Sequence, residues 1–262
     1  MTVVRFERVG SLGHIILRNP PLNLIGASFN ECLKQAVHEA FECDIRALLI
    51  RAEGPNFSKG GDVAEFLNLS TETFRTFISE IHNSYRAIES MPIPTVAAVR
   101  GAAFGGAFEL ALACDFIVAA DNAVFQSIEA SVGSAPLCGA VQRVAERAGR
   151  ARAVRYMMLS EPMTGQVAGE IGVAAFVKPE GDVEAEALAL AQRLASGPTR
   201  SYAAIRTLLK AWAGGGIAAA DTILLDVTMP LHSSEDARRG RTARVKAIEN
   251  GIEPSPPVFT GR

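Results

Sequence analysis

One glutamate stands alone in an apolar run and is the residue of this sequence best suited to chemistry. Glu109 lies within residues 107–114, where every other residue is apolar. A helix that is apolar on all sides is expected to be buried. A buried carboxylate is costly unless it is paired or protonated, so either a hidden basic partner exists or the carboxyl faces a cavity. In the second case its pKa rises toward the range that suits acid–base catalysis.

A second carboxyl, that of Glu129, follows a short predicted strand at residues 124–126. Taken alone, it is an ordinary loop acid. It gains a role if the strands around residues 117 and 124 are neighbours, because it would then lie close to Glu109. Two carboxyls at one site can divide the giving and the taking of a proton.

Two glycine-rich turns are candidates for binding an anion. Residues 58–62 (Ser-Lys-Gly-Gly-Asp) follow one predicted strand, and residues 101–106 (Gly-Ala-Ala-Phe-Gly-Gly) follow another. Glycine lets backbone N–H groups approach a ligand closely, and a following helix N-terminus favours negative charge. A tight turn explains either segment taken singly. Two of them at equivalent places favour a shared pocket with paired donors for a developing oxyanion.

Several common kinds of site are absent from the sequence. None of the motifs of phosphate-binding loops, dinucleotide-binding turns, serine hydrolases or zinc proteases occurs. No two histidines have a ligand spacing on one helix, and no two cysteines have the C-x-x-C spacing of zinc or redox sites. These residues are His14, His38, His82, His232, Cys32, Cys43, Cys114 and Cys138. We therefore expect no metal, and reduced cysteines within the core.

Two groups of basic residues leave two interpretations open. Arg143, Arg147 and Arg150 lie along one side of a predicted helix, and a second group lies between residues 238 and 246. A solvated, ion-paired face is the usual explanation for such groups. The functional alternative is contact with the phosphates of an acidic ligand, or with another subunit.

Composition narrows the class of protein. The 262 residues are 48% hydrophobic and 21% charged, with a formal net charge of -2, which excludes a disordered chain. Near-neutral charge gives no global reason to bind nucleic acid. No apolar run approaches the roughly 18 residues of a membrane-spanning helix, and the first residues lack the core of a signal peptide. These features predict a cytoplasmic protein without a membrane partner.

Alternating strand and helix patterns predict the elements that hold these candidates. A hairpin at residues 3–8 and 14–18 precedes a helix from Phe29, for which Ser28 and Glu31 have the spacing of a capping box. A strand at 47–50 leads to a helix that carries an apolar stripe from Phe74 to Ile88. Strands at 95–99, 116–119 and 124–126 then alternate with helices at 105–113 and 139–148. Such alternation predicts an α/β fold with helices packed outside sheets.

From Asp182 onward the strand patterns stop. Residues 183–196, 199–213 and 217–249 read as helices, separated by Gly197-Pro198 and by a triple glycine at 214–216. We therefore expect an α/β core over residues 1–181 and a helical region over 182–262. Its apolar content requires that it fold back on the core or pack against another subunit.

Taken together, five segments resemble signatures of the crotonase superfamily, also called the enoyl-CoA hydratase/isomerase superfamily. They are residues 19–23, 57–66, 99–115 and 126–143, together with the ending at 234–238 and 257–262. The resemblance covers nearly the whole chain. It implies a spiral of repeated ββα units, a helical C-terminal region that forms homotrimers or hexamers, and an acyl-CoA thioester substrate. It implies no metal or redox cofactor, since coenzyme A is part of the substrate.

The resemblance also assigns roles by position. The amides of Gly61 and Gly106 match the two oxyanion-hole donors, and Glu109 and Glu129 match the two glutamates with which hydratases deliver water across a double bond. The implied substrate-binding residues are Leu22, Lys59, Gly60, Gly61, Asp62, Gly106 and Gly133. Isomerases of the superfamily usually retain one of the two glutamates.

The sequence departs from the usual pattern at several positions. Lys59 and Gly61 stand in place of the usual alanines, Ala107 in place of a glycine, and Ile128 where proline often precedes the second glutamate. Residues 137–138 (Leu-Cys) replace part of a glycine-rich stretch. Backbone donors survive such changes, whereas the orientation of Glu129 is less constrained. Enoyl-CoA hydration is the leading hypothesis; double-bond isomerisation, another crotonase reaction and a non-catalytic acyl-CoA binding scaffold are the alternatives.

Overall fold

A large, mostly parallel sheet forms the centre of the protein. The computed structural model describes residues 2–253 and 255–261. Six strands pair in the order β1-β2-β3-β4-β6-β9, and only the hairpin of β1 and β2 is antiparallel. Their bounds are β1 (Val4–Val9), β2 (Leu12–Leu17), β3 (Ala47–Ala52), β4 (Thr95–Val99), β6 (Phe116–Ala120) and β9 (Phe176–Lys178). The predicted hairpin and the α/β class are confirmed.

A second sheet contains three short strands, β5 (Ala102–Phe104), β7 (Val124–Gln126) and β8 (Met163–Thr164). The prediction that residues 101–106 form only a turn is therefore wrong at β5. Three residues carry too little pattern to reveal a strand, and this one exists because it pairs with β7. Along the chain, β4 and β5 are followed by one helix, and β6 and β7 by the next. The predicted repeat of ββα units is therefore confirmed.

The first part of the chain contributes three helices to the fold. They are α1 (Ala27–Glu42), α2 (Val63–Phe66) and α3 (Thr71–Ser90). The expected capping box of α1 is wrong, because the helix begins after Gly26 and no side chain of its own caps it. Instead, Glu65 of α2 accepts a hydrogen bond from the Ala27 amide. A cap supplied from a distant segment leaves no local signal in the sequence.

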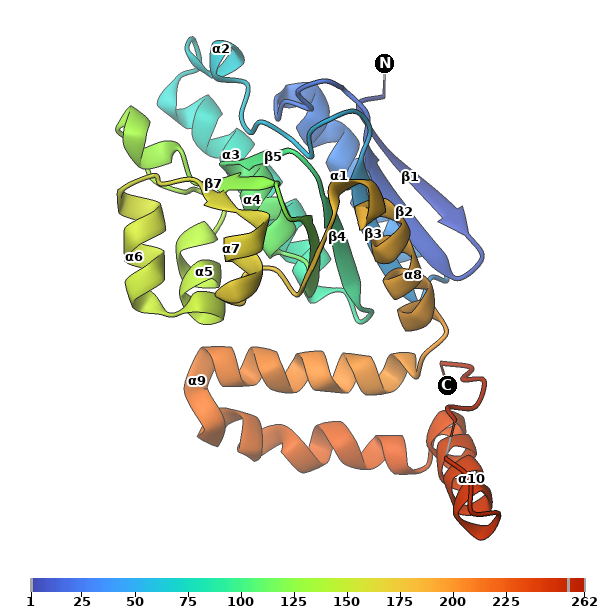
Figure 1. Cartoon of the computed structure of the whole chain (residues 1–262). Helices are drawn as coiled ribbons and strands as arrows, with labels where there is room; N and C mark the ends of the chain where they lie inside the picture. The colour runs from blue at the N-terminus through green and yellow to red at the C-terminus, as the bar shows by residue number, and fades with distance from the viewer. Residues whose placement is uncertain (1, 254, 262) are drawn as a thin grey trace.

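The helix that contains Glu109 lies in the middle of the body (Figure 1). It is α4 (Gly106–Leu112), and its residues from Ala107 to Leu112 are all buried, which confirms the expectation drawn from its apolar run. The helices that follow are α5 (Ala140–Ala148), α6 (Arg150–Met158) and α7 (Gly165–Glu170). Two short 3-10 turns, η1 (Glu129–Val132) and η2 (Glu180–Asp182), complete this part.

The first helix of the predicted C-terminal region packs against the large sheet. α8 (Val183–Ala195) buries Val183, Ala187 and Ala191 and contacts β3 and β4. α9 (Thr199–His232) and α10 (Glu235–Glu249) instead extend below the body in Figure 1. The predicted single helix over 217–249 is wrong, because Ser234 begins α10 by capping it. A division of the chain at residue 181 stays a prediction.

α9 is long and apolar, and in the single chain it meets the rest of the protein mainly through its first part, where Tyr202 packs on the core and Arg206 bonds to Asp115 and Glu89. Ala204 is its one buried residue, and its mean hydropathy over 18 residues is 1.3, so by length and composition alone it passes as a membrane-spanning helix. The predicted break at the triple glycine is confirmed, since Gly215 and Gly216 leave helical geometry and the helix turns back on itself (Figure 1). Each arm is shorter than the roughly 20 residues that a span requires.

Candidate active site

The two glycine-rich turns lie side by side. Ser58 donates its amide to the Ala102 carbonyl at 2.9 Å, and Phe104 donates its amide to the Ser58 carbonyl at 3.1 Å. Gly60 has a φ of +86°, and a Cβ there would lie 2.6 Å from the Phe104 carbonyl oxygen. Glycine is therefore required at this position by both the backbone conformation and the close approach of β5.

The amides of Gly61 and Gly106 are available as donors. Within residues 2–253 and 255–261, no hydrogen-bond acceptor meets either amide. Ile25 connects the two glycines, because its backbone pairs with Gly61 and its Cδ1 lies 3.2 Å from the place that a Cβ on Gly106 would take. Both glycines are partly exposed. Two unpaired N–H groups near one side chain suit the oxygen of a thioester that is gaining charge.

A buried hydroxyl fixes the peptide that follows the second donor. Tyr85 is fully buried, and its Oη donates to the Gly106 carbonyl at 2.9 Å. Gly106 is also the first residue of α4, so its N–H belongs to the positive end of that helix. The start of α4 is therefore held before any substrate arrives. The sequence pattern placed Tyr85 only within the apolar stripe from Phe74 to Ile88.

Glu109 is almost completely buried, with 2% of its surface exposed. Its Oε1 accepts hydrogen bonds from the amides of Cys138 at 2.7 Å and Ala140 at 3.0 Å, at the start of α5. The pKa of Glu109 is raised to about 7, mainly by burial and also by the Glu129 charge, while the two amide bonds and the Arg143 charge act in the opposite direction. The carboxyl can thus exchange a proton near neutral pH.

Glu129 reaches the same place from the smaller sheet. It begins η1, and its Oε1 lies 3.0 Å from the position that a Cβ on Gly105 would take, immediately before α4. Ser127 donates its hydroxyl to Oε2 at 2.6 Å. The expected reason for this proximity, neighbouring strands around residues 117 and 124, is wrong because β6 and β7 lie in different sheets. The pairing of β7 with β5 brings Glu129 to α4 instead.

The remaining predicted substrate-binding residues lie in two places, beside the first glycine-rich turn and at the end of η1. The Leu22 carbonyl accepts a hydrogen bond from the Lys59 amide at 2.9 Å, so both lie beside Gly60 and Gly61. Asp62 caps α2 by accepting from the Glu65 amide. Gly133 is exposed and ends η1, beyond Glu129. Among the described residues no three metal-ligand side chains gather, and the absence of a metal cofactor stays a prediction.

The three arginines predicted to share one helix lie on two, since Arg143 and Arg147 belong to α5 and Arg150 begins α6. The expected solvated face is wrong for the two arginines of α5. Arg143 is 8% exposed and pairs with Glu89, and Arg147 donates to the carbonyls of Leu112 and Val173. Both side chains fold back onto the body, where their charges meet carbonyl oxygens and a carboxylate. Arg150 alone of the three is exposed. Helical spacing could not show that α5 ends before Gly149, nor that α3 and α4 supply partners for Arg143 and Arg147.

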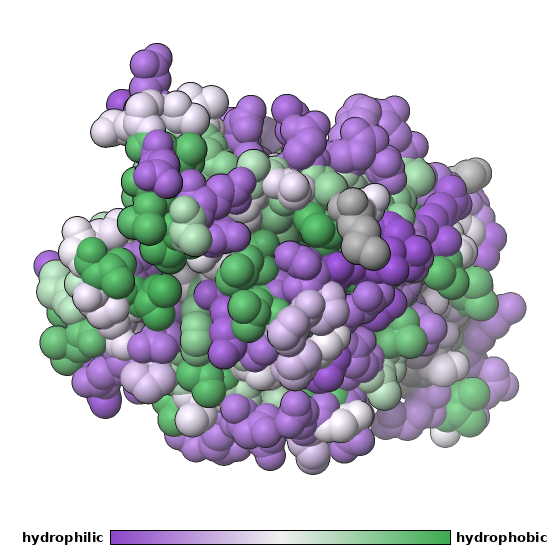
Figure 2. Space-filling model, turned by 90° about the horizontal axis from the view of Figure 1, so that it is seen from above, coloured by the Kyte–Doolittle hydropathy of each residue, from purple (hydrophilic) through white to green (hydrophobic). Residues whose placement is uncertain are grey.

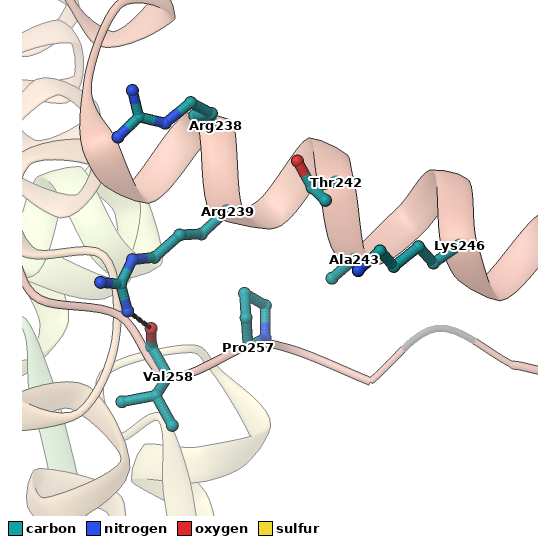
Figure 3. Close-up of a pocket in the computed structure, with 7 residues that line it drawn as sticks. All are labelled: Arg238, Arg239, Thr242, Ala243, Lys246, Pro257 and Val258. Carbon is teal, nitrogen blue, oxygen red and sulfur yellow. Dashed lines mark hydrogen bonds between the residues drawn. The ribbon is translucent and has the colours of Figure 1, made fainter.

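A surface pocket of 420 Å³ lies elsewhere, between α10 and the C-terminal segment (Figure 3). Arg239 donates to the Val258 carbonyl there and pairs with Glu235, as expected for an ion-paired face. None of the residues that line it belongs to the glycine turns or to the carboxyl pair.

The face seen from above carries hydrophobic groups among hydrophilic ones (Figure 2). Exposed apolar side chains near the turns include Leu22, Val63 and Leu67.

Comparison with known proteins agrees with this arrangement. The sequence profile of the family described as "Enoyl-CoA hydratase/isomerase" matches residues 7–247. The chain belongs to this family. It is therefore a member of the crotonase superfamily, and the resemblance drawn from five sequence segments is confirmed.

Relatives of this enoyl-CoA hydratase/isomerase family member carry both activity names. A "Probable enoyl-CoA hydratase" from Rhodobacter capsulatus is 31% identical over 264 residues, covering 99% of this chain and 98% of the relative. An "Enoyl-CoA isomerase/hydratase" from Mycosarcoma maydis is 28% identical and covers 83% of this chain and 77% of its own. The crystal structure of an enoyl-CoA hydratase from Polaromonas sp. JS666 has a TM-score of 0.87 and 28% identity, covering 96% of this chain and 98% of that one.

Proposed function

We propose that the protein is an enoyl-CoA hydratase, which adds water reversibly across the 2,3 double bond of an enoyl-CoA thioester. The single observation that carries this proposal is the meeting of two carboxyls, Glu109 and Glu129, beside the unpaired amide of Gly106. The family acts on acyl-CoA thioesters, and the site supplies what their hydration requires.

In the proposed reaction the amides of Gly61 and Gly106 hold the thioester oxygen as it becomes enolate-like. One carboxylate takes a proton from water while the water oxygen bonds to C3, and the electrons of the C2=C3 bond move toward the thioester. The other carboxyl gives its proton to C2, which restores the carbonyl. The pair therefore begins and ends with one proton between its two carboxyls, and no electron is gained or lost.

Two features of the site support this division of work. The pKa of Glu109 near 7 lets a carboxyl hold a proton at the pH at which the other carboxyl must accept one. The turn that carries Gly61 is held by hydrogen bonds between Ser58 and β5, and Tyr85 holds the Gly106 carbonyl, so little reorganisation is needed when charge develops. Isomerisation, in which one glutamate moves a proton between carbons, is the second candidate, favoured by the name of the Mycosarcoma maydis relative.

Two substrates separate the candidates. The purified protein is mixed with crotonyl-CoA and, separately, with a 3-enoyl-CoA, and the absorbance of the conjugated thioester is followed. Hydration removes this absorbance from crotonyl-CoA, whereas isomerisation creates it from the 3-enoyl ester. Binding of both esters without turnover of either would leave the non-catalytic scaffold as the better account. A panel of enoyl-CoA esters of increasing chain length then defines the acyl group.

We further propose that the protein works without a metal or redox cofactor in the cytoplasm, as a homotrimer or homohexamer. Hydration is redox-neutral, and amides and carboxyls suffice for it; dialysis against a chelator is expected to leave turnover unchanged. The apolar side chains of α9 support assembly, because Ile205, Leu209 and Trp212 are 54%, 58% and 45% exposed in one chain. Light scattering at micromolar concentration tests this, and a stable monomer would contradict it.

A further inference from the structure

Arg143 occupies an unusual place at the start of its own helix. Its Nη1 donates to the carbonyls of Cys138 at 3.1 Å and Gly139 at 3.2 Å, although a cation is electrostatically unfavourable at a helix N-terminus. Gly139 has a φ of +104°, and any Cβ there would overlap with Arg143 Nη1. The backbone at residue 139 is therefore shaped to admit this guanidinium.

A carboxylate on another helix fixes the other side of the guanidinium. Glu89 of α3 accepts from Arg143 Nε at 2.7 Å and from Nη2 at 2.6 Å, which makes a two-point pair. The backbone of Glu89 is itself held, because Arg206 of α9 donates to its carbonyl at 2.7 Å. The Arg143 end of this pair is buried, at 8% exposure, whereas the Glu89 carboxylate reaches solvent with 39% of its side chain exposed.

The segment held by Arg143 is the segment that holds Glu109. Cys138 offers its carbonyl to Arg143 and its amide to Glu109 Oε1, and the Ala140 amide completes the seat of the carboxyl. We propose that Arg143, held by Glu89, is a positioning residue that sets the placement and protonation of Glu109 through residues 138–140. This inference rests on the proposed function, since it concerns the residue that moves a proton there.

The charges around Glu109 fix the expected direction of its titration. Glu129 on η1 raises its pKa, and Arg143 on α5 lowers it; the Cys138 thiol and the Tyr85 hydroxyl also face it. Removing the Arg143 charge therefore raises the pKa of Glu109, and a looser loop weakens the two amide bonds, which also raises it. Arg143 in turn faces Glu89, with His82 and Arg86 nearby on α3.

The test compares Arg143→Gln, Arg143→Lys and Glu89→Gln with Arg147→Gln, a control on the same helix that loses only structural carbonyl contacts. A catalytic carboxyl displaced by about 1 Å costs on the order of 10²-fold in turnover. We expect kcat of Arg143→Gln to fall by about this factor with little change in KM, because the oxyanion donors are untouched. Arg143→Lys and Glu89→Gln should fall less.

The ionisation of Glu109 gives a second measurement that needs no turnover. The infrared band of its carboxyl, assigned by its loss in Glu109→Gln, is followed against pH. Its titration should move to higher pH in Arg143→Gln and Glu89→Gln and stay in place in Arg147→Gln. If the wild-type protein turns over no enoyl-CoA, the proposed function fails while this measurement still decides the role of Arg143. Unchanged kcat and unchanged titration in all three variants would overturn the inference.

Discussion

Glu109 and Glu129 lie close together near the start of α4, but the structures that hold them differ. Glu109 lies inside a buried helix and is held by two backbone amides, whereas Glu129 begins a short 3-10 turn and is held by one hydroxyl. Burial dominates the pKa of Glu109, which rises to about 7. The difference teaches that a pair of identical side chains becomes an acid–base pair through unequal surroundings.

The largest expected effect comes from replacing either carboxyl. Glutamine preserves size and most hydrogen bonding but cannot exchange a proton, so Glu109→Gln and Glu129→Gln should each lower hydration by about 10²- to 10⁴-fold. If both carboxyls act on one water, the double variant should lower the hydration rate much less than the product of the two single losses. Steady-state kinetics with crotonyl-CoA, alongside an acyl-CoA binding measurement, gives these values.

An unequal result would change the proposed reaction. Should Glu129→Gln retain hydration while Glu109→Gln abolishes it, the mechanism with two carboxyls fails. Isomerisation by one glutamate would then be the better account, and the departure from the family pattern at Ile128 would explain it.

The second prediction concerns the donor that both carboxyls adjoin. Gly106 begins α4, and proline is well tolerated at the first position of a helix, so Gly106→Pro removes the N–H at a position compatible with the helix. Loss of one oxyanion donor typically costs about 10²- to 10³-fold in turnover. Gly106→Ala keeps the N–H and adds a methyl group 3.2 Å from Ile25 Cδ1, which makes it the matched control.

Near-normal turnover of a folded Gly106→Pro enzyme would remove Gly106 from the oxyanion hole. Gly61 is a poorer site for the same test, because any side chain there would lie 2.6 Å from the Phe66 ring.

Glu109 was predictable from the sequence for a physical reason. A lone acid in an otherwise apolar helix reports burial directly, and burial is the main cause of its raised pKa. The glycine turns were predictable in the same way, because glycine marks a close approach of backbones. The alternation of strands and helices gave the fold class.

The other parts of the site depend on contacts between distant segments. Glu129 reaches α4 through β5, a strand of three residues that exists only by pairing. Arg143 folds back on its own helix because Glu89 meets it there, and Tyr85 supports Gly106 from α3. Spacing along one helix cannot show which partner covers it, so these residues looked like an exposed face or plain core.

The third prediction is that the buried carboxyl of Glu109 lowers the free energy of unfolding at neutral and higher pH. The pKa of Glu109 is raised in the folded protein, so the folded state binds more protons than the unfolded state between about pH 4.5 and 7. Its contribution to stability therefore falls as pH rises through this window and is most unfavourable above pH 7. Glu109→Gln should raise the free energy of unfolding at pH 8 by about 1–3 kcal/mol.

Denaturant unfolding at pH 8 and at pH 4 measures this effect. The gain should shrink at pH 4, where the wild-type carboxyl is protonated in both states. Glu129→Gln, at a half-buried carboxyl, is the comparison variant and should change the stability less. A Glu109→Gln protein that is less stable than the wild type at pH 8 would contradict the assigned surroundings of Glu109.

The smallest expected effect concerns the single hydroxyl that holds Glu129. Ser127 is 2% exposed, and its donation to Glu129 Oε2 at 2.6 Å is the one side-chain hydrogen bond that this carboxyl receives among the described residues. A hydrogen bond to a charged group contributes about 1.5 kcal/mol, which corresponds to roughly tenfold in rate. Ser127→Ala should therefore lower kcat about tenfold, while Ser127→Thr, which keeps the hydroxyl, loses less. In the background of Glu129→Gln the Ser127→Ala change should lose most of its effect, because the carboxylate that it orients is gone. An undiminished loss in that background would mean that Ser127 supports the fold of η1 and not the second carboxyl.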